Sequence, residues 1–464
     1  MRFGKIEVFI LASIIKGTLL SVYCLNGQTE VQNQTLSFGG FVRGGAYYDL
    51  NRQNDKPLFS SGFSDLALKL EARQEDKMRA FSDIRLRYGS EFNNSVNSIT
   101  IREAFTEVYF PFFRFSIGQQ IIKWAKTDFT TTNSKLNPQN FITRSPDRED
   151  MDLGNIIASL SWYPSPIFDF QAVYIPFYRP SVLLVDQVPI PEGVEIKSLK
   201  SLVTDKNYSG YGFKGSIHIR GADLGVTWFD GYDPMPGIKL DEFSLDMSGP
   251  VPVASTKLSV TPYKIRSAGI FFEAVTGEIC TRGEVALSDP YADYRENEYV
   301  PAPEVKWVGG FDYTPGDWRI VFEYSGKYIT RFTRPDTEPL IGTEPDYTQL
   351  LQLISTPGFD IKEYVRKQTE AFNRLYNYQL EKSYHSAGLR LEKEIAYGKY
   401  VTSLSGLYNF TAHELLLIPE IKFKPYDAIT ITAGAEIYSG RKGSLYKLVN
   451  DFMESIYAGI RIDF

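Results

Sequence analysis

The last ten residues of the chain, Ser455-Ile-Tyr-Ala-Gly-Ile-Arg-Ile-Asp-Phe464, alternate between two kinds of side chain up to the final residue. Successive side chains of a β-strand point to opposite faces. One face of this segment would be apolar, with Ile456, Ala458, Ile460, Ile462 and Phe464. The other would be polar or small, with Tyr457, Gly459, Arg461 and Asp463. The segment is therefore predicted to be a β-strand with one face against an apolar environment and the other against water.

The same alternation recurs along most of the chain. In 63–73, for example, Leu66 and Leu68 share one face while Lys69 lies on the other. The pattern predicts strands at 35–49, 63–73, 79–91, 101–110, 112–123, 154–163, 168–176, 208–219, 222–231, 260–274, 278–288, 304–313, 318–330, 383–395, 400–411, 414–423, 429–439 and 455–464. These are eighteen strands, and sixteen is the alternative count because boundaries read from periodicity carry errors of a few residues.

The connections between these strands alternate in length. Those after even-numbered strands are short, at 74–77, 111, 163–166, 221, 276–277, 314–317, 397–399 and 424–427. Those after odd-numbered strands are mostly long, at 124–153, 177–207, 232–259 and 331–382, with a tight turn at 411–413 as the exception. A soluble β-sandwich has no reason to sort its loops in this way, whereas bacterial membrane barrels do. We therefore predict an all-β, antiparallel transmembrane β-barrel with long extracellular loops.

Composition agrees with a membrane barrel. Aromatic residues make up 14% of the chain, with 30 Tyr and 32 Phe, and such residues form girdles where barrels meet the membrane surface. No stretch approaches the roughly 18 uninterrupted apolar residues that a spanning helix needs, so strands must do the crossing. The net charge of -6 makes nucleic acid an unlikely class of partner.

The N-terminus predicts the cellular compartment. Arg2 and Lys5 precede an apolar run that ends before Gly27, as in a secretory signal peptide. We expect residues 1–27 to be the signal and residues 28–464 to form one barrel domain in the bacterial outer membrane. Without Cys24, the mature chain keeps only Cys280, which excludes an intramolecular disulfide.

Charged residues on the wet faces are candidates for the pore lining. Too few residues separate position 27 from the first strand for a plug domain, and a barrel of this size has room for an aqueous channel. The alternation places eight charged candidates on the inner wall: Lys69, Arg73, Asp83, Arg85, Arg87, Arg390, Glu392 and Arg461. They would either select the sign of a solute or simply be solvated lumen charges.

The connection 124–153 is the third long-side loop, and its charges form a second set of candidates. Together with Arg102 upstream, they are Lys126, Asp128, Arg144, Asp147, Arg148 and Asp150. The loop resembles, in position alone, the third loop of general porins, which folds into the barrel and narrows it. That resemblance implies a constriction with both signs of charge and with Trp124 anchoring its start. The alternative is a solvated loop surface in which Asn137-Pro138 is a turn.

Two motifs resemble known families. Arg102-Glu-Ala-Phe105, Ile117-Gly-Gln119-Gln120-Ile-Ile-Lys-Trp124 and Asn137-Pro138 resemble a porin-like family of bacterial outer-membrane barrels, found beside lipid- and steroid-handling exporters and otherwise of unknown function. Gln119 and Ala125 depart from the Arg and Gly that are common there. The resemblance implies a barrel that moves solutes, with hydrophobic solutes as one option. The ending with Tyr457, Gly459 and Phe464 resembles the C-terminal signal that the barrel-assembly machinery recognises.

One long connection contains a helical pattern. Ile361, Val365, Phe372, Leu375 and Gln379 fall at helical spacing after Pro357-Gly358. A helix with one apolar stripe must pack on something. It would either form a lid over the pore mouth or pack on neighbouring loops.

These patterns favour a channel for small solutes over two alternatives. The first is a surface-binding or adhesion protein that acts through its long loops. The second is an enzyme, which we do not expect because the three histidines, His218, His385 and His413, belong to no hydrolase motif. We expect no cofactor and no metal. The expected partners are outer-membrane lipid, the assembly machinery and a small solute, and a homotrimer is one option for the assembly.

Overall fold

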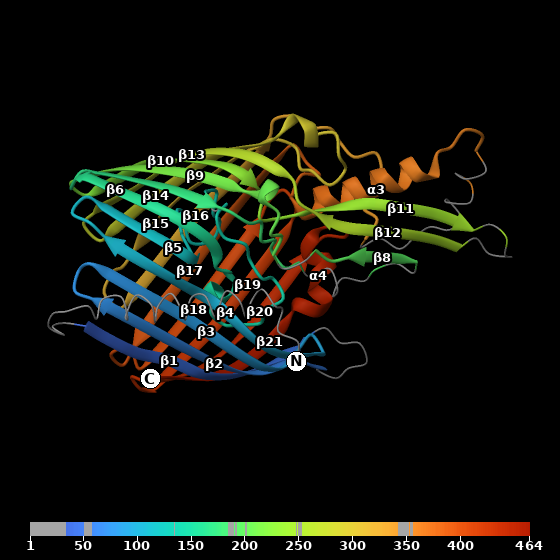
Figure 1. Cartoon of the computed structure of the whole chain (residues 1–464). Helices are drawn as coiled ribbons and strands as arrows, with labels where there is room; N and C mark the ends of the chain where they lie inside the picture. Colours follow the sequence, from blue (N-terminus) through green and yellow to red (C-terminus); the bar gives the residue numbers. More distant parts are fainter. Residues whose placement is uncertain are drawn as a thin grey trace.

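The computed structural model describes residues 34–464 except 51–57, 134, 184–189, 191–192, 200–201, 247, 249–252, 342–351 and 353–355. Eighteen antiparallel strands form a closed barrel (Figure 1). They are β1 (Gln34–Asp49), β2 (Leu58–Gln74), β3 (Met78–Glu91), β4 (Asn94–Tyr109), β5 (Phe113–Gln120), β6 (Asn155–Ser165), β7 (Phe168–Ile175), β9 (Gly210–Ile219), β10 (Ala222–Tyr232), β13 (Lys264–Thr276), β14 (Ile279–Pro290), β15 (Glu304–Tyr313), β16 (Trp318–Ile329), β17 (Ser383–Ile395), β18 (Tyr400–Asn409), β19 (Glu414–Tyr426), β20 (Ile429–Gly440) and β21 (Ser455–Asp463).

Each strand pairs with its neighbours along the chain, and β21 closes the barrel on β1. The closing register pairs Phe41 with Asp463, and Gly40 exchanges two backbone hydrogen bonds with Phe464, at 2.9 and 3.1 Å. The start of β1 and the end of the chain therefore lie together at the end of the barrel that carries the short turns, which we call the short-turn end. The opposite end is the long-loop end. The predicted barrel and its count of eighteen strands are confirmed.

The two faces of the wall differ as the alternation predicts. On β21, Ile456, Ile460 and Ile462 are each 44–45% exposed on the outer face, whereas Tyr457 is buried inside at 6%. Exposed aromatic rings gather at both ends of the outer face. Phe110, Phe112, Trp318, Tyr397, Tyr426 and Phe464 lie near the short-turn end, and Tyr48, Phe59, Tyr88, Tyr328 and Phe410 lie near the long-loop end. This is the arrangement of the two aromatic girdles of a membrane barrel.

Two predicted strands were too short by several residues, 63–73 within β2 and 101–110 within β4. The range 101–110 belongs to β4, which begins at Asn94, because Phe92 and Asn93 both take positive φ (48° and 63°) and form a two-residue hairpin turn. A bulge at Arg102 interrupts the alternation of side chains, so the first half of the strand was not recognised from the sequence. The register shifts between Asp83 and Ile84, so the phase of the alternation changes at Arg102.

The sequence did not predict the small sheet at the long-loop end. This sheet contains β8 (Val194–Lys197), β11 (Gly237–Asp246) and β12 (Val253–Thr261), which lie within predicted loops. A short helix, α4 (Leu445–Met453), was also missed. In Figure 1 the sheet extends beyond the barrel beside helix α3 (Ile361–Tyr376). None of the helices within the described ranges is both long and apolar enough to cross a bilayer.

Helix α3 is the helix that the sequence predicted, and it packs on this sheet. Asp360 caps its start by accepting a hydrogen bond from the Glu363 backbone N–H (3.1 Å). Phe372 packs with Ile238, Leu258 and Ile341 in a core of buried side chains. We call β8, β11, β12 and α3 together the cap. Of the two arrangements that the sequence left open, the described contacts show packing on neighbouring loop structure.

Asn373 joins α3 to β11 and gives a test of the cap. Its buried side chain pairs with the backbone of Ile238, accepting from N–H at 2.8 Å and donating to C=O at 2.7 Å. Asn373→Ala leaves both groups without these partners, so we expect it to destabilise the cap by about 2 kcal/mol. Limited proteolysis should then cut 237–246 faster, whereas Asn377→Ala, which removes only a side-chain bond within the helix, should not change the cutting rate.

Candidate functional site

Residues 121–154, which we call the inner loop, leave β5 and run inside the barrel before the chain enters β6. The loop bonds to inward-facing side chains on widely separated parts of the wall, including Glu284 of β14, Glu323 of β16 and Arg43 of β1. The segment singled out by the sequence as a loop folded into the barrel therefore lies in the lumen.

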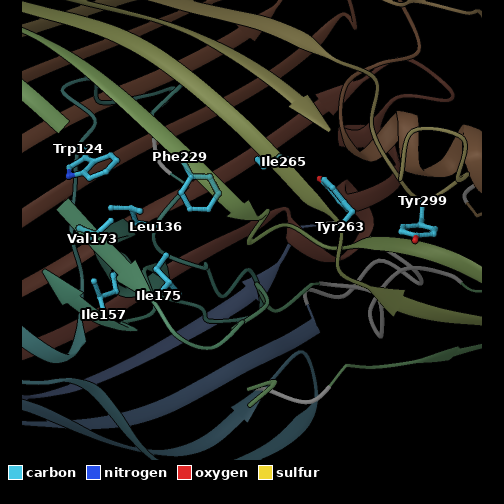
Figure 2. Close-up of a cluster of buried hydrophobic side chains, with 9 residues drawn as sticks. All are labelled: Trp124, Leu136, Ile157, Val173, Ile175, Phe229, Tyr263, Ile265 and Tyr299. Carbon is cyan, nitrogen blue, oxygen red and sulfur yellow. The ribbon is translucent and has the colours of Figure 1, made fainter. Parts of the chain in front are cut away.

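The motif residues hold the base of this loop against the wall. Trp124 is 3% exposed, packs with Leu136 and Ile157 inside the barrel, and donates from Nε1 to Gln171 Oε1 at 2.8 Å (Figure 2). Asn137 pairs its side-chain amide with both backbone groups of Ile122, at 3.2 and 2.8 Å, and so closes the loop on itself. The C=O of Pro138 accepts a hydrogen bond from the Leu153 backbone N–H (2.9 Å).

The two glutamines of the motif have different partners. Gln120 is buried, donates to the Ile157 C=O at 2.8 Å, and accepts from Ser116 Oγ at 2.9 Å. Gln119 donates to the carbonyls of Ile101 and Arg102, which lie at the bulge in β4. A bulge leaves backbone groups out of the ladder, and the Gln119 amide supplies a partner for them. The motif therefore builds the support of the loop.

The tip of the inner loop is held by two buried wall carboxylates, which we call the tip attachment. Glu323 accepts hydrogen bonds from the backbone N–H groups of Asp128 (2.5 Å), Phe129 (2.8 Å) and Thr130 (3.4 Å). Glu284 accepts from Thr132, through its N–H at 3.2 Å and its Oγ1 at 2.9 Å, and from the N–H of Lys126. Both carboxylates are 2% exposed. Hydrogen bonds to ionised groups in such dry surroundings are among the stronger ones in proteins.

Side-chain contacts reinforce the tip attachment. Arg282 pairs with Asp128 at 2.9 Å, and Lys126 pairs with Glu273 at 2.8 Å. The Arg390 guanidinium lies 5.7 Å from the centre of the Phe129 ring. The predicted candidates Lys126, Asp128 and Arg390 are thus brought together at the β13–β17 side of the barrel.

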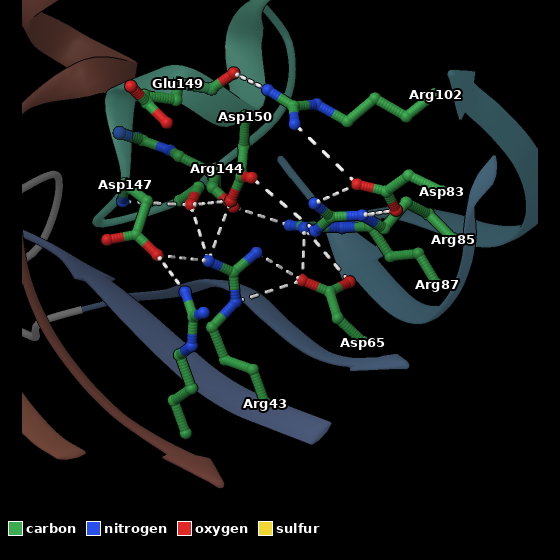
Figure 3. Close-up of polar contacts among 12 residues, drawn as sticks. Arg43, Asp65, Asp83, Arg85, Arg87, Arg102, Arg144, Asp147, Glu149 and Asp150 are labelled. Carbon is green, nitrogen blue, oxygen red and sulfur yellow. Dashed lines mark hydrogen bonds and ion pairs between the residues drawn. The ribbon is translucent and has the colours of Figure 1, made fainter. Parts of the chain in front are cut away.

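The second half of the loop is fastened to the opposite wall, in what we call the arginine attachment (Figure 3). Arg43, whose side chain is 4% exposed, pairs with Asp65 at 2.6 Å on the wall and with Asp150 at 2.8 Å and Asp147 at 3.2 Å on the loop. Arg461 also reaches Asp147, at 3.1 Å. Burial alone would raise the pKa of Asp150, but the charges of Arg43 and Arg85 and the hydrogen bonds from Ser145 and Arg43 together outweigh it, and the pKa lies below its usual value. Asp150 is therefore ionised at neutral pH.

Arg144 and Arg87 extend the arginine attachment. The Arg144 side chain, 3% exposed, pairs with Glu436 of β20 at 2.8 Å and donates to the carbonyls of Phe452 and Met453 at the end of α4. Its own C=O accepts from Arg87 at 2.6 Å. One loop residue thus joins β3, β20 and α4.

The other candidates lie around these attachments. Arg85 pairs with Asp83 at 2.6 Å and approaches Asp150 at 3.6 Å. Arg102 donates to the Glu149 C=O at 2.7 Å. Arg148 is exposed at the start of a 3-10 helix, Arg148–Met151. Lys69 is half-buried, and Arg73 pairs with Glu71 near the short-turn end. Most of the arginines have carboxylate or carbonyl partners.

Sequence reasoning missed the wall residues that grip the loop. Arg43, Asp65, Arg282, Glu284 and Glu323 lie within predicted strands, and alternation places them on the wet face. The sequence feature that could have identified these residues is a charged residue between apolar neighbours, as in Gly283-Glu284-Val285. Alternation gives the direction of a side chain but not the loop that it meets, because that contact is more than 100 residues away in sequence.

An opening remains beside the arginine attachment, on the side of β19 and β20. No hydrogen bond or ion pair joins the described inner-loop residues to β18 or β19. On this side a cavity of about 210 Å³ lies between Asp147 of the loop and the wall, where Lys422, Tyr457 and Arg461 line it. The open lining therefore carries both signs of charge and a hydroxyl group.

Comparisons with known proteins agree on the fold alone. The chain is similar to Acinetobacter baumannii OccAB1 (9% identity, TM-score 0.50, covering 92% of this chain and 96% of that one). It is also similar to Pseudomonas aeruginosa OccK9 (OpdG) (6% identity, TM-score 0.52, covering 92% and 97%). No protein-family model matches the chain, and no curated protein matches it significantly. The motif resemblance at 102–141 and its link to exporters thus stay predictions, while the barrel fold is shared along nearly the whole length.

Proposed function

We propose that this barrel is a channel of the bacterial outer membrane that passes small solutes, narrowed by the inner loop. The observation that carries the proposal is the fastening of one loop to opposite walls of the lumen, at Glu284 and Glu323 on one side and at Arg43 and Arg144 on the other. A loop that only decorated the surface would not need buried charged contacts across the lumen. The two aromatic girdles and the apolar outer face support the membrane location.

The lining of the opening favours small polar solutes. Lys422, Arg461 and Asp147 surround it, so a purely hydrophobic solute would have to displace water from charged groups. The hydrophobic solutes implied by the family resemblance therefore remain the less favoured option. Selection by charge is proposed to act at this opening, because Lys422, Lys424, Arg461 and Asp147 all line it.

The C-terminal strand supports recognition by the assembly machinery. Phe464 is 52% exposed on the outer face beside Phe38, whereas Tyr457 faces inward and donates to Glu420 at 3.0 Å. The exposed terminal ring is the part available to a partner. Assembly as a homotrimer stays a prediction, which crosslinking in native membranes would test.

Surface binding is a second candidate because of the cap. A sheet and a helix with their own buried core, Phe372 against Ile238 and Leu258, exceed what a simple loop needs. We propose no enzymatic activity. His218 lies between the carboxylates of Asp169 and Asp223 at 2.7 and 2.8 Å, and His385 bonds to the Tyr324 hydroxyl at 2.7 Å, so neither is paired with a serine or cysteine nucleophile.

Single-channel recording tests the proposal. Chain 28–464, refolded and reconstituted in planar bilayers, should give stable conductance steps, and a salt gradient should reveal any selectivity. Deleting 237–261, the β11–β12 hairpin, should leave these steps in place if the barrel is a channel. A folded protein that gives no steps with or without the hairpin would contradict the channel and favour surface binding.

A further inference from the structure

A groove of about 570 Å³ lies in the outer face of the barrel, across β7, β9, β10, β13 and β14. Its floor is strand backbone, and its sides are apolar side chains, such as Phe170 of β7, Val226 of β10 and Ile270 of β13. These side chains are 42%, 58% and 58% exposed, so nothing within the described chain covers them. The exposed sides of the groove face outward, and the buried Glu284, which holds the inner loop, also belongs to its lining.

Two glycines create the groove. Gly215 of β9 and Gly283 of β14 occupy outer-face positions where neighbouring strands carry large residues. A Cβ on Gly215 would lie 3.3 Å from the Phe170 ring, and a Cβ on Gly283 would meet the Phe272 ring. The Phe170 and Phe272 rings therefore lie close to glycine backbone that carries no side chain. A side chain at either glycine would fill the groove.

The groove runs from the middle of the wall toward the short-turn end. Gly215 lies midway along β9, and Ile217 and Leu224 continue the lining toward the turn that joins β9 to β10. That turn contains Arg220, which is exposed and forms no ion pair with any described residue. The apolar groove thus leads to the cationic side chain of Arg220 at the short-turn end.

We propose that this groove binds one acyl chain of a phospholipid from the leaflet at the short-turn end, with an anionic headgroup at Arg220. The inference rests on the proposed membrane location. Bulk lipid is as apolar as the groove, so retention over bulk exchange must come from the close fit of one chain in the recess and from the pairing of its anionic headgroup with Arg220. A second copy of the protein fits less well, because stable protein interfaces bury about 1,200 Å² or more over complementary surfaces, whereas this feature is a narrow recess.

Native mass spectrometry tests the proposal. Chain 28–464 in mild detergent is titrated with dioleoylphosphatidylglycerol or dioleoylphosphatidylethanolamine. We expect one phosphatidylglycerol to be retained by the wild type. Gly215→Leu should retain about tenfold less, because the leucine side chain occupies the recess beside the Phe170 ring. Arg220→Gln should lower retention of phosphatidylglycerol to the level of phosphatidylethanolamine.

Gly406→Leu is the matched control. Gly406 lies on the outer face of β18, opposite Leu389, and its Cβ would meet Leu417 at an ordinary 3.5 Å. The Gly406→Leu variant should retain as much phosphatidylglycerol as the wild type. If Gly215→Leu does not fold, Ile270→Trp fills the same groove.

Several outcomes overturn the proposal. They are equal retention by a folded groove-filled variant, equal loss in Gly406→Leu, and a dimer peak that disappears when the groove is filled. Conductance recorded on the same samples separates this failure from failure of the channel itself, because the substituted position, Gly215, lies on the outer face of the barrel opposite Val226.

Discussion

Replacing Glu323 with glutamine detaches the tip of the inner loop and raises the conductance of the channel. The carboxylate accepts three consecutive backbone N–H groups, from Asp128, Phe129 and Thr130. A glutamine keeps one acceptor oxygen and turns an NH₂ group toward N–H donors. Charged hydrogen bonds contribute about 1.5–3 kcal/mol each, so losing two of them costs about 3 kcal/mol or more. That is a factor of about 100 in the ratio of attached to detached loop.

Single-channel recording measures this effect directly. We expect larger and noisier steps for Glu323→Gln, and a greater increase when Glu284→Gln is added. The control is Glu392→Gln on the neighbouring strand β17, because Glu392 makes no hydrogen bond or ion pair with the described part of the inner loop. Unchanged step size in the double variant would show that the tip does not limit the current.

Replacing Arg144 with methionine loosens the other side of the loop and destabilises the barrel. The change leaves Glu436 and the carbonyls of Phe452 and Met453 without their cation. Breaking a buried ion pair by removing one partner costs about 3–5 kcal/mol, because the remaining charge stays buried. The end of α4 also loses a favourable positive charge.

Unfolding by urea in detergent measures the stability, and recording reports the loop. We expect a lower unfolding midpoint and more frequent current fluctuations for Arg144→Met. Arg148→Met is the control, since Arg148 is exposed four residues along the same loop. Equal effects of both substitutions would mean that the loop charges matter only through net charge.

The sequence was sufficient for the barrel because alternation repeats in every strand. Each strand has one face against an apolar environment, so its side chains alternate with a period of two residues. This alternation identifies a strand even when its predicted ends are wrong by a few residues. Where the period breaks, prediction failed. The change of phase at the Arg102 bulge concealed the first half of β4. Strands β8, β11 and β12 were assigned to loops because they lie within the long connections between barrel strands.

The candidate site was only partly predictable, for a different reason. Sequence position suggested that 124–153 folds inward and that its charges matter. It could not show that Arg43 is shared between Asp65 and the loop, or that Glu284 and Glu323 receive the loop backbone. Such contacts depend on the closed barrel bringing together residues that are far apart in the chain.

The most direct test of the inner loop uses a cysteine at its tip. Cys280→Ser removes the lone thiol of the mature chain, and Phe129→Cys then places a single thiol beside Arg390. A cationic methanethiosulfonate reagent added to open channels should reduce the current in one step, because the label adds bulk at the constriction. Labelling confirmed by mass but without any change in current would contradict a loop that narrows the channel.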